Sequence, residues 1–218
     1  MGAVDSSASS VRRSSLAASL LFAANCAAAC QTSGGARPIA AAFWFEGLTP
    51  AAIDVIDQRL GAPLTGDELR AIELAARREL DIAFEHTRLR FTSTRDYVYR
   101  VRVVPNVAHG FYPAAGQSRT FGGVRGDGTV SFNTVALAAF VHASPTSTRD
   151  MLVDAIGRGI GRTAVHEFAH QILGPAAMHG EDRLSYEYED LRAEHFYAQL
   201  HWGPAGVELQ RRVGLVQE

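Results

Sequence analysis

The chain has 218 residues, of which 47% are hydrophobic and 20% are charged, and its formal net charge is -2. This composition excludes a disordered or fibrous chain and predicts one globular domain with a full hydrophobic core. The 21 basic residues are scattered among 23 acidic ones instead of forming clusters, so we expect no nucleic acid among its partners.

The first thirty residues are expected to be a signal segment separate from the domain, which we place at residues 31–218. A pair of arginines precedes the apolar stretch from Leu16 to Ala29, which is too short to span a bilayer and has the order of a secretory signal. Cys26 and Cys30 are the only cysteines, so the domain itself has no disulfide and no thiolate metal site. We therefore expect export, as a secreted or periplasmic protein or as a lipoprotein tethered to the membrane through Cys30.

The first elements of the domain are a strand and two helices. Ile39 to Phe45 is an apolar run of strand length. Thr49 to Leu60 begins with a capping residue and a proline and keeps apolar residues on one face, as expected for a helix. Thr65 and Glu68 form a capping box, and apolar residues follow at steps of three and four up to Ala83. This pattern predicts a long amphipathic helix.

Strands follow the second helix. Leu89 to Thr92 and Tyr97 to Val104 alternate bulky apolar residues with polar residues or arginine, which is the period of half-buried strands. Gly122 to Gly128 is a glycine-rich turn. We predict a third strand after it, from Thr129 to Val135.

Two long helices are expected to complete the domain. Ser147 and Asp150 predict the start of a helix that runs to Leu173, although three glycines weaken its middle by up to about 1 kcal/mol each. Gly and Pro then end this helix. After a loop, Ser185 is expected to cap a last long helix from Tyr186 to about Trp202.

The first of these two helices carries a metal-binding motif, His-Glu-Phe-Ala-His. His166 and His170 are four residues apart, so their rings project from one helix face and can bind one ion. Glu167 lies beside the first ligand, where it can take a proton from a water molecule. The neighbouring residues are uncharged, as a helix buried against a sheet requires. The motif therefore predicts a zinc site with Glu167 as the general base.

Zinc needs a third protein ligand, and a catalytic site leaves the fourth position open. Four downstream residues could supply the third ligand: His179, Asp182, Glu187 and Glu194. The chain must turn back after the helix before any of them can approach the ion, and we expect the loop that contains Asp182 to be the first segment able to do so. Glu187 and Glu194 lie one heptad apart on the expected last helix, so either could complete the site instead.

The motif resembles that of the zincins, the metallopeptidases with HExxH on their active-site helix, and the similarity in segment order extends from Leu69 to Trp202. The resemblance implies an α+β, zincin-like fold, with a small mixed sheet packed on the active-site helix and a C-terminal helical subdomain. The chain departs from the metzincin pattern HExxHxxGxxH, because Gly174 comes one residue late and Ala176 replaces the third histidine.

The segment after the helix is more similar to the aspzincins, the deuterolysin-like peptidases, whose third ligand is an aspartate in GTxDxxYG. Gly180-Glu181-Asp182 followed by Tyr186 resembles that motif, without its threonine and with altered spacing, and Ala193 to Ala198 resembles a later helix of the same family. This resemblance implies that Asp182 is the third ligand and that Tyr186 donates a hydrogen bond to the oxyanion. The rival is a gluzincin-like site completed by Glu187 or Glu194.

The expected function is that of a monomeric zinc metalloendopeptidase that acts on a peptide or protein. Thr129 to Asn133 is expected, by the same resemblance, to be the edge strand along which the substrate lies. Two alternatives stay open: a zincin-fold protein that binds zinc without turnover, and a zinc hydrolase of a non-peptide amide or ester. Glu167 argues against the first alternative, because structural zinc sites have four protein ligands and need no base.

Overall fold

The computed structural model describes residues 37–53, 56, 59–92, 97–110, 112–121, 125–174 and 179–215. They belong to one compact unit, Gly35–Glu218. The expected signal segment, with Cys26 and Cys30, lies outside the described residues. Within the part of the chain that is described, no helix combines the length and the apolar character needed to cross a membrane.

A five-stranded mixed sheet forms one layer, with the strand order β2-β1-β3-β7-β6. Its first four strands in that order run parallel, and β6 runs antiparallel to β7 at one edge. A separate two-stranded hairpin is formed by β4 and β5. The strands are β1 (Ile39–Phe45), β2 (Leu89–Thr92), β3 (Tyr99–Val104), β4 (Val107–His109), β5 (Tyr112–Ala114), β6 (Gly116–Phe121) and β7 (Arg125–Ser131).

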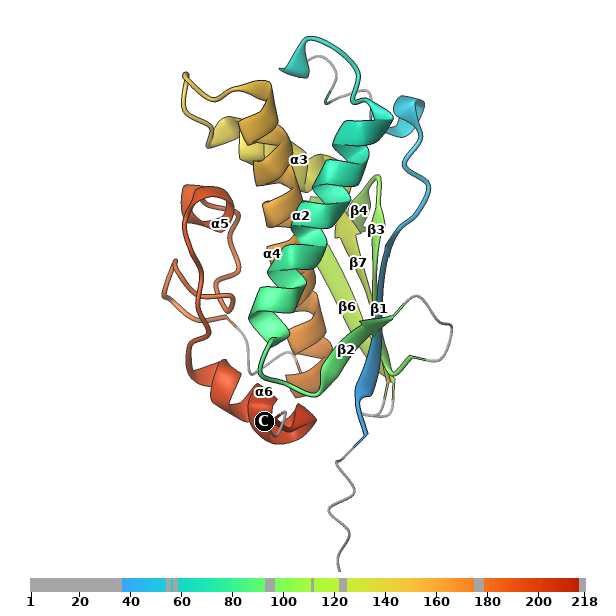
Figure 1. The fold of residues 1–218 in the computed structure, drawn as a ribbon, viewed down its shortest axis with the longest axis vertical. Coiled ribbons are helices and arrows are strands. Elements are labelled where there is room, and N and C mark those ends of the chain that lie inside the picture. Colours follow the sequence, from blue (N-terminus) through green and yellow to red (C-terminus); the bar gives the residue numbers. More distant parts are fainter. Residues whose placement is uncertain are drawn as a thin grey trace, which may run out of the picture. The chain divides into compact units, whose positions relative to one another are not determined.

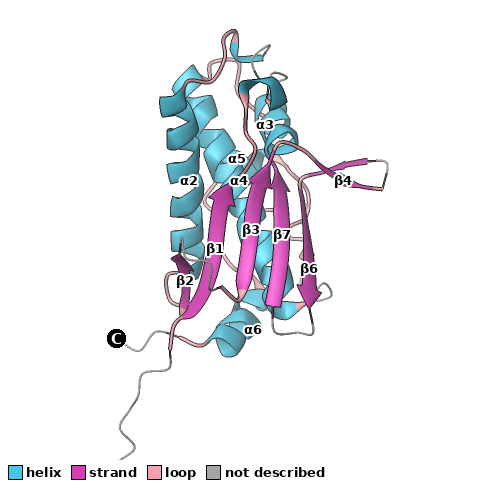
Figure 2. Ribbon diagram, turned by 90° about the vertical axis from the view of Figure 1, so that its right-hand side faces the viewer, coloured by secondary structure: helices cyan, strands magenta, loops and turns pink. Residues whose placement is uncertain are grey.

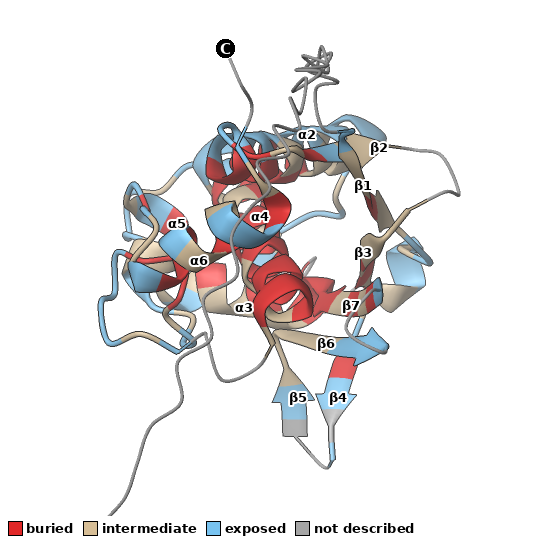
Figure 3. Cartoon of the chain, turned by 90° about the horizontal axis from the view of Figure 1, so that it is seen from below, coloured by how far each residue is buried: buried red, intermediate tan, exposed pale blue. Residues whose placement is uncertain are grey.

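The helices form the other layer, and Figure 3 shows them on one side of the sheet. The long helix α4 lies against the sheet, and α2 packs beside it (Figures 1 and 2). The helices are η1 (Pro50–Ala52), α2 (Gly66–Phe84), α3 (Phe132–Val141), α4 (Arg149–Leu173), α5 (Ala193–Tyr197) and α6 (Pro204–Val213). The expected helix from Thr49 to Leu60 begins as the short η1, and residues 54, 55, 57 and 58 lie outside the described part.

Side-chain caps fix where the two long helices begin. Thr65 accepts a hydrogen bond from the Glu68 amide, and Glu68 accepts one from the Thr65 amide, so the predicted capping box at the start of α2 is confirmed. At the start of α4 the capping residue is Thr148, which accepts from the Met151 amide, and not Ser147 as predicted. Each cap satisfies an amide that the helix itself leaves without a partner.

The glycines in the middle of α4 let its neighbours come close. A Cβ atom on Gly157 would lie 2.7 Å from the Ile72 carbonyl oxygen of α2, and one on Gly161 would lie 2.5 Å from the Ala76 carbonyl oxygen. Any side chain at either position would therefore clash with the backbone of α2. The residues that weaken α4 as an isolated helix are therefore the ones that allow α2 to pack tightly against it.

A buried glutamine fixes α4 to the sheet one residue after the HExxH motif. The Gln171 amide nitrogen donates to the Arg100 carbonyl of β3 at 3.0 Å, and the Gln171 amide oxygen accepts from the Arg100 N–H at 3.3 Å. Gly126 and Gly128 of β7 leave the room that this side chain occupies. The motif helix is thereby held at a defined height and rotation on the sheet.

Two predicted elements differ from the structure because other hydrogen bonds satisfy the backbone there. The strand predicted from Thr129 to Val135 ends at Ser131, whose side chain caps α3 by accepting from the Thr134 amide at 3.3 Å. The long helix predicted from Tyr186 to Trp202 is wrong. The Tyr186 amide donates instead to the His201 carbonyl at 3.0 Å, so the chain there forms loops around the short α5.

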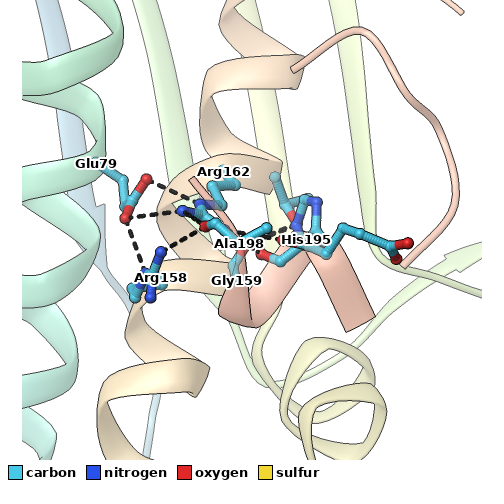
Figure 4. Close-up of polar contacts among 8 residues, drawn as sticks. Glu79, Arg158, Gly159, Arg162, His195 and Ala198 are labelled. Atoms are coloured by element: carbon cyan, nitrogen blue, oxygen red, sulfur yellow. Dashed lines mark hydrogen bonds and ion pairs between the residues drawn. The ribbon is translucent and has the colours of Figure 1, made fainter. Parts of the chain in front are cut away.

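A buried polar cluster connects α2, α4 and α5 (Figure 4). Arg162 is only 2% exposed, and its guanidinium donates to Glu79 at 2.8 Å and to the backbone carbonyls of His195 and Ala198. Arg158 donates to the other oxygen of Glu79 at 3.1 Å. Because every carbonyl involved belongs to the segment around α5, this cluster holds that segment against the motif helix.

Removing one partner of this cluster is expected to destabilise the fold strongly. Glu79→Ala leaves the buried Arg162 without its counter-ion, so we expect the free energy of unfolding to fall by about 3–5 kcal/mol in urea denaturation. Asp67→Ala on the same helix is the matched control, because Asp67 and Arg70 form an exposed pair that contributes about 1 kcal/mol or less. Equal losses in the two variants would show that the buried cluster has no special role.

Candidate metal centre

Three histidines converge at the end of α4. Among the described residues, His166, His170 and His179 form a group whose ligand atoms all lie within 4.8 Å of one another. The Nε2 atoms of His166 and His170 are 3.0 Å apart. The four-residue spacing on one helix turns both rings to the same side, as the sequence predicted, and the loop after α4 brings the third ring.

This geometry fits a zinc ion. At zinc–nitrogen distances of about 2.0–2.1 Å in a tetrahedral site, two ligand nitrogens are about 3.3 Å apart. Burial lowers the pKa of His166, and it lowers the pKa of His170 to about 4 together with the charges of His166 and His179. Both rings are therefore neutral at pH 7, as metal binding requires. Three nitrogen ligands leave a fourth position, which is the arrangement of catalytic zinc sites.

Hydrogen bonds orient two of the three rings. The Nδ1 atom of His166 donates to the Tyr186 carbonyl at 3.0 Å, which leaves Nε2 with its lone pair toward the site. The Nδ1 atom of His179 lies 2.9 Å from a carboxylate oxygen of Glu189 and donates to it, so its Nε2 is the nitrogen left for a metal. A carboxylate in this position also makes the imidazole a stronger ligand.

The backbone of His179 is strained. Its φ angle is 86°, and it is the one non-glycine residue with positive φ among those described. The amides of His179 and Gly180 both donate to the Glu187 carbonyl at 3.0 Å, which holds this conformation. Such strain persists only where the surroundings enforce it, and it is common at ligand sites.

The carboxylates predicted as possible third ligands lie elsewhere. Asp182, expected to be the ligand, pairs with His201 at 3.0 Å and accepts from the Leu184 amide, so the structure does not bring it to the histidines. The buried Glu187 carboxylate accepts from the Ala205 amide at 2.8 Å and caps the start of α6. Glu194 lies outside the group of three histidines, and its backbone carbonyl accepts a hydrogen bond from Arg162. His179, whose amide donates to the Glu187 carbonyl, joins the two histidines of α4 instead, and its positive φ angle is not predictable from the local pattern.

Tyr186 contributes its backbone to the site and not its hydroxyl. Its side chain is only 4% exposed and packs against Trp202, with the ring centroids 5.1 Å apart. Burial, together with the charge of Glu79, raises the pKa of the Tyr186 hydroxyl to about 12. The expected role as an oxyanion donor therefore does not match the geometry, because the ring belongs to the core beneath the site.

Glu167 is buried on α4 next to His166. It is 5% exposed, and burial raises the pKa of its carboxyl to about 7, although a hydrogen bond from the Ser118 hydroxyl opposes this shift. Gly116 of β6 lets the strand pass close to the carboxylate, since a Cβ there would lie 2.9 Å from the Glu167 Cδ. A carboxyl group with a pKa near neutrality is suited to take up and release a proton at pH 7.

A cleft of about 710 Å³ opens in front of these residues. One wall is the segment from Pro113 to Thr120, which includes β6, and the other is the segment from Tyr188 to Leu191. The strand beside the motif is thus β6, whereas the sequence analysis placed Thr129 to Asn133 there. The residues of β7 lie inside the sheet between β3 and β6.

His195 is a cleft residue that the sequence analysis did not single out. Its Nε2 atom lies 3.1 Å from the Gly159 carbonyl and donates to it, and burial lowers the pKa of the ring to about 3. His195 therefore stays neutral in the wall of the cleft. No local pattern identifies it, because it reaches α4 from α5, more than thirty residues further along the chain.

The Glu189 carboxylate offers a test of how His179 is held. Glu189→Ala is expected to weaken zinc binding by about 10- to 100-fold, because the His179 ring loses the group that orients it. The measurement is competition with a chromophoric chelator. Asp190→Ala is the control, since Asp190 lines the same cleft wall but pairs with Arg192; an equal effect there would contradict the role of Glu189.

Comparisons with known proteins were made for the sequence and for the fold. No protein-family model and no curated protein matches the sequence. Among solved structures, the chain is similar to archaemetzincin from Methanopyrus kandleri, with a TM-score of 0.43 and 15% sequence identity; the match covers 83% of this chain and 98% of archaemetzincin. The narrower resemblance to the aspzincins stays a prediction. The predicted mixed sheet packed on the helix with HExxH is confirmed by the structure itself.

Proposed function

We propose that this protein is a zinc-dependent endopeptidase whose metal ligands are His166, His170 and His179 and whose general base is Glu167. The observation that carries the proposal is the convergence of three imidazoles on one point, beside a buried carboxylate, at the wall of an open cleft. Three ligands with an adjacent base are the arrangement of a catalytic site, since a structural zinc has four protein ligands.

Each residue has a defined task in peptide hydrolysis. His166, His170 and His179 would hold the zinc ion, which would supply a Lewis acid for water and for the substrate carbonyl. Glu167 takes the proton of the attacking water and then gives it to the amine that leaves when the C–N bond breaks. The Ser118 hydroxyl keeps the Glu167 carboxylate in place. The walls of the cleft hold the peptide beside these groups.

The test combines metal analysis with a cleavage assay on the full chain. We expect about one zinc per chain after purification without chelators, cleavage of casein or of a peptide library, loss of cleavage with a chelator, and recovery on adding zinc. A chain that takes up no zinc would contradict the site. A chain that binds zinc but cleaves neither peptides nor casein would contradict the peptidase and favour a binding protein or a hydrolase of another amide or ester.

A further inference from the structure

The free edge of β6 is available for pairing with another strand. The Ser131 amide of β7 donates to the Ala115 carbonyl at 2.7 Å, next to the start of β6. In an antiparallel pair, the residues bonded to the partner strand alternate with residues whose N–H and C=O groups point away. Gln117 and Arg119 therefore bond to β7, whereas the backbone groups of Ser118 and Thr120 point to the open edge. An extended peptide can pair with these groups.

The side chains of β6 divide between two faces. Gly116 and Ser118 face Glu167. Since side chains alternate along a strand, Arg119 points to the opposite face of the sheet, the one that α4 does not cover (Figure 2). Arg119 is exposed and also lines the cleft. A peptide paired with β6 would thus place alternate side chains beside Arg119, within a few residues of the peptide bond that lies next to Glu167.

Arg119 has no acidic partner within the described chain. Its cross-strand neighbour is Asp127, but Arg100 lies 2.5 Å and Arg102 lies 3.9 Å from the Asp127 carboxylate oxygens. No ion pair or hydrogen bond of the Arg119 side chain is found among the described residues. Arg102 also pairs with Glu46 at 3.1 Å, so three arginines stand against two carboxylates and the local charge is positive.

The acidic residues on the other wall of the cleft have partners of their own. Glu189 accepts from His179 at 2.9 Å, and Asp190 pairs with Arg192 at 2.9 Å. Neither carboxylate forms an ion pair with Arg119.

We propose that Arg119 selects peptide substrates with an aspartate or glutamate side chain beside it, close to the cleaved bond. The proposal rests on the peptidase function proposed above. An acidic side chain of the bound peptide, directly across from Arg119 on the same face, forms a favourable cross-strand pair with it. A lysine of the peptide at that position is unfavourable. Because the pair is exposed, salt weakens it. Arg119 acts on specificity and not on the chemical step.

The experiment uses a set of neutral fluorogenic peptides that carry a single glutamate, or a single glutamine of the same size, at each of three positions on either side of the cleaved bond. For the wild type we expect kcat/KM to be about 2- to 5-fold higher with glutamate than with glutamine at one position, mainly through KM. Arg119→Gln is expected to bring this ratio to about 1, Arg119→Glu to reverse it, and Arg119→Lys to retain it. The wild-type ratio should fall toward 1 at 1 M salt.

Arg125→Glu is the matched control. Arg125 is exposed on the neighbouring strand β7 and does not line the cleft, so the same change of charge there should leave the ratio unchanged. A wild-type ratio of 1 at every position, or a ratio that Arg119→Glu leaves unaltered, would overturn the proposal. If the zinc-loaded wild type cleaves no peptide of the set and no casein, the peptidase function fails instead.

Discussion

Glu167→Gln is expected to lower the rate of peptide hydrolysis by at least about 100-fold while the zinc content stays unchanged, because the variant loses its general base. Glutamine has the shape of glutamate and still offers an oxygen to the Ser118 hydroxyl, but it takes up no proton at neutral pH. Glu167 does not belong to the group of metal ligands, so zinc binding is not expected to change. The measurements are kcat and zinc content on the same preparation.

The control for this variant is Glu85→Gln, the same substitution at an exposed residue that follows α2 and lies outside the cleft. It should have the activity of the wild type. Full activity of Glu167→Gln would show that the Glu167 carboxylate is not the general base. A variant that has lost its zinc would show instead that Glu167 supports the metal site.

His179→Ala is expected to weaken zinc binding by more than about 100-fold and to abolish peptidase activity with it. The variant removes one of three ligand nitrogens, and loss of a direct ligand should exceed the 10- to 100-fold effect of losing a group that only orients one. Asp182→Ala should bind zinc nearly as well as the wild type, because Asp182 pairs with His201. Zinc affinity by chelator competition compares the two.

The opposite result is equally informative. If Asp182→Ala loses zinc and His179→Ala retains it, the loop adopts another arrangement when the metal is bound, and the aspzincin-like ligand set predicted from the sequence is the correct one. If both variants retain zinc, the third ligand is neither residue.

The sequence identifies His166, Glu167 and His170 because their relation is local. Residues one and four positions apart on a helix have a fixed geometry, whatever the rest of the chain does. The capping box at Thr65 and Glu68 is local in the same way, and the structure confirms it. An apolar run predicts β1, and the alternation of apolar and polar residues predicts β2, each with its observed bounds.

The third ligand depends on contacts that no local pattern encodes. His179 reaches the site through a positive φ angle and through hydrogen bonds to the Glu187 carbonyl, eight residues later. The segment from Tyr186 to Trp202 was predicted as one helix because Ser185 can cap it, but the pairing of Tyr186 with His201 satisfies the backbone differently. Edge strand β6 was not predicted, since Gly116 to Phe121 is polar and shows no apolar alternation.

The glycines of α4 also affect the stability of the helix that positions His166 and His170. Gly157, Gly159 and Gly161 together disfavour an isolated helix by roughly 2–3 kcal/mol relative to alanine, and helix nucleation adds to this cost. The spacing of His166 and His170 is therefore not prearranged in the unfolded chain. It appears when α2 packs into the room that Gly157 and Gly161 leave. Metal binding and the packing of α2 are thus thermodynamically linked, because each stabilises the helical conformation that the other requires.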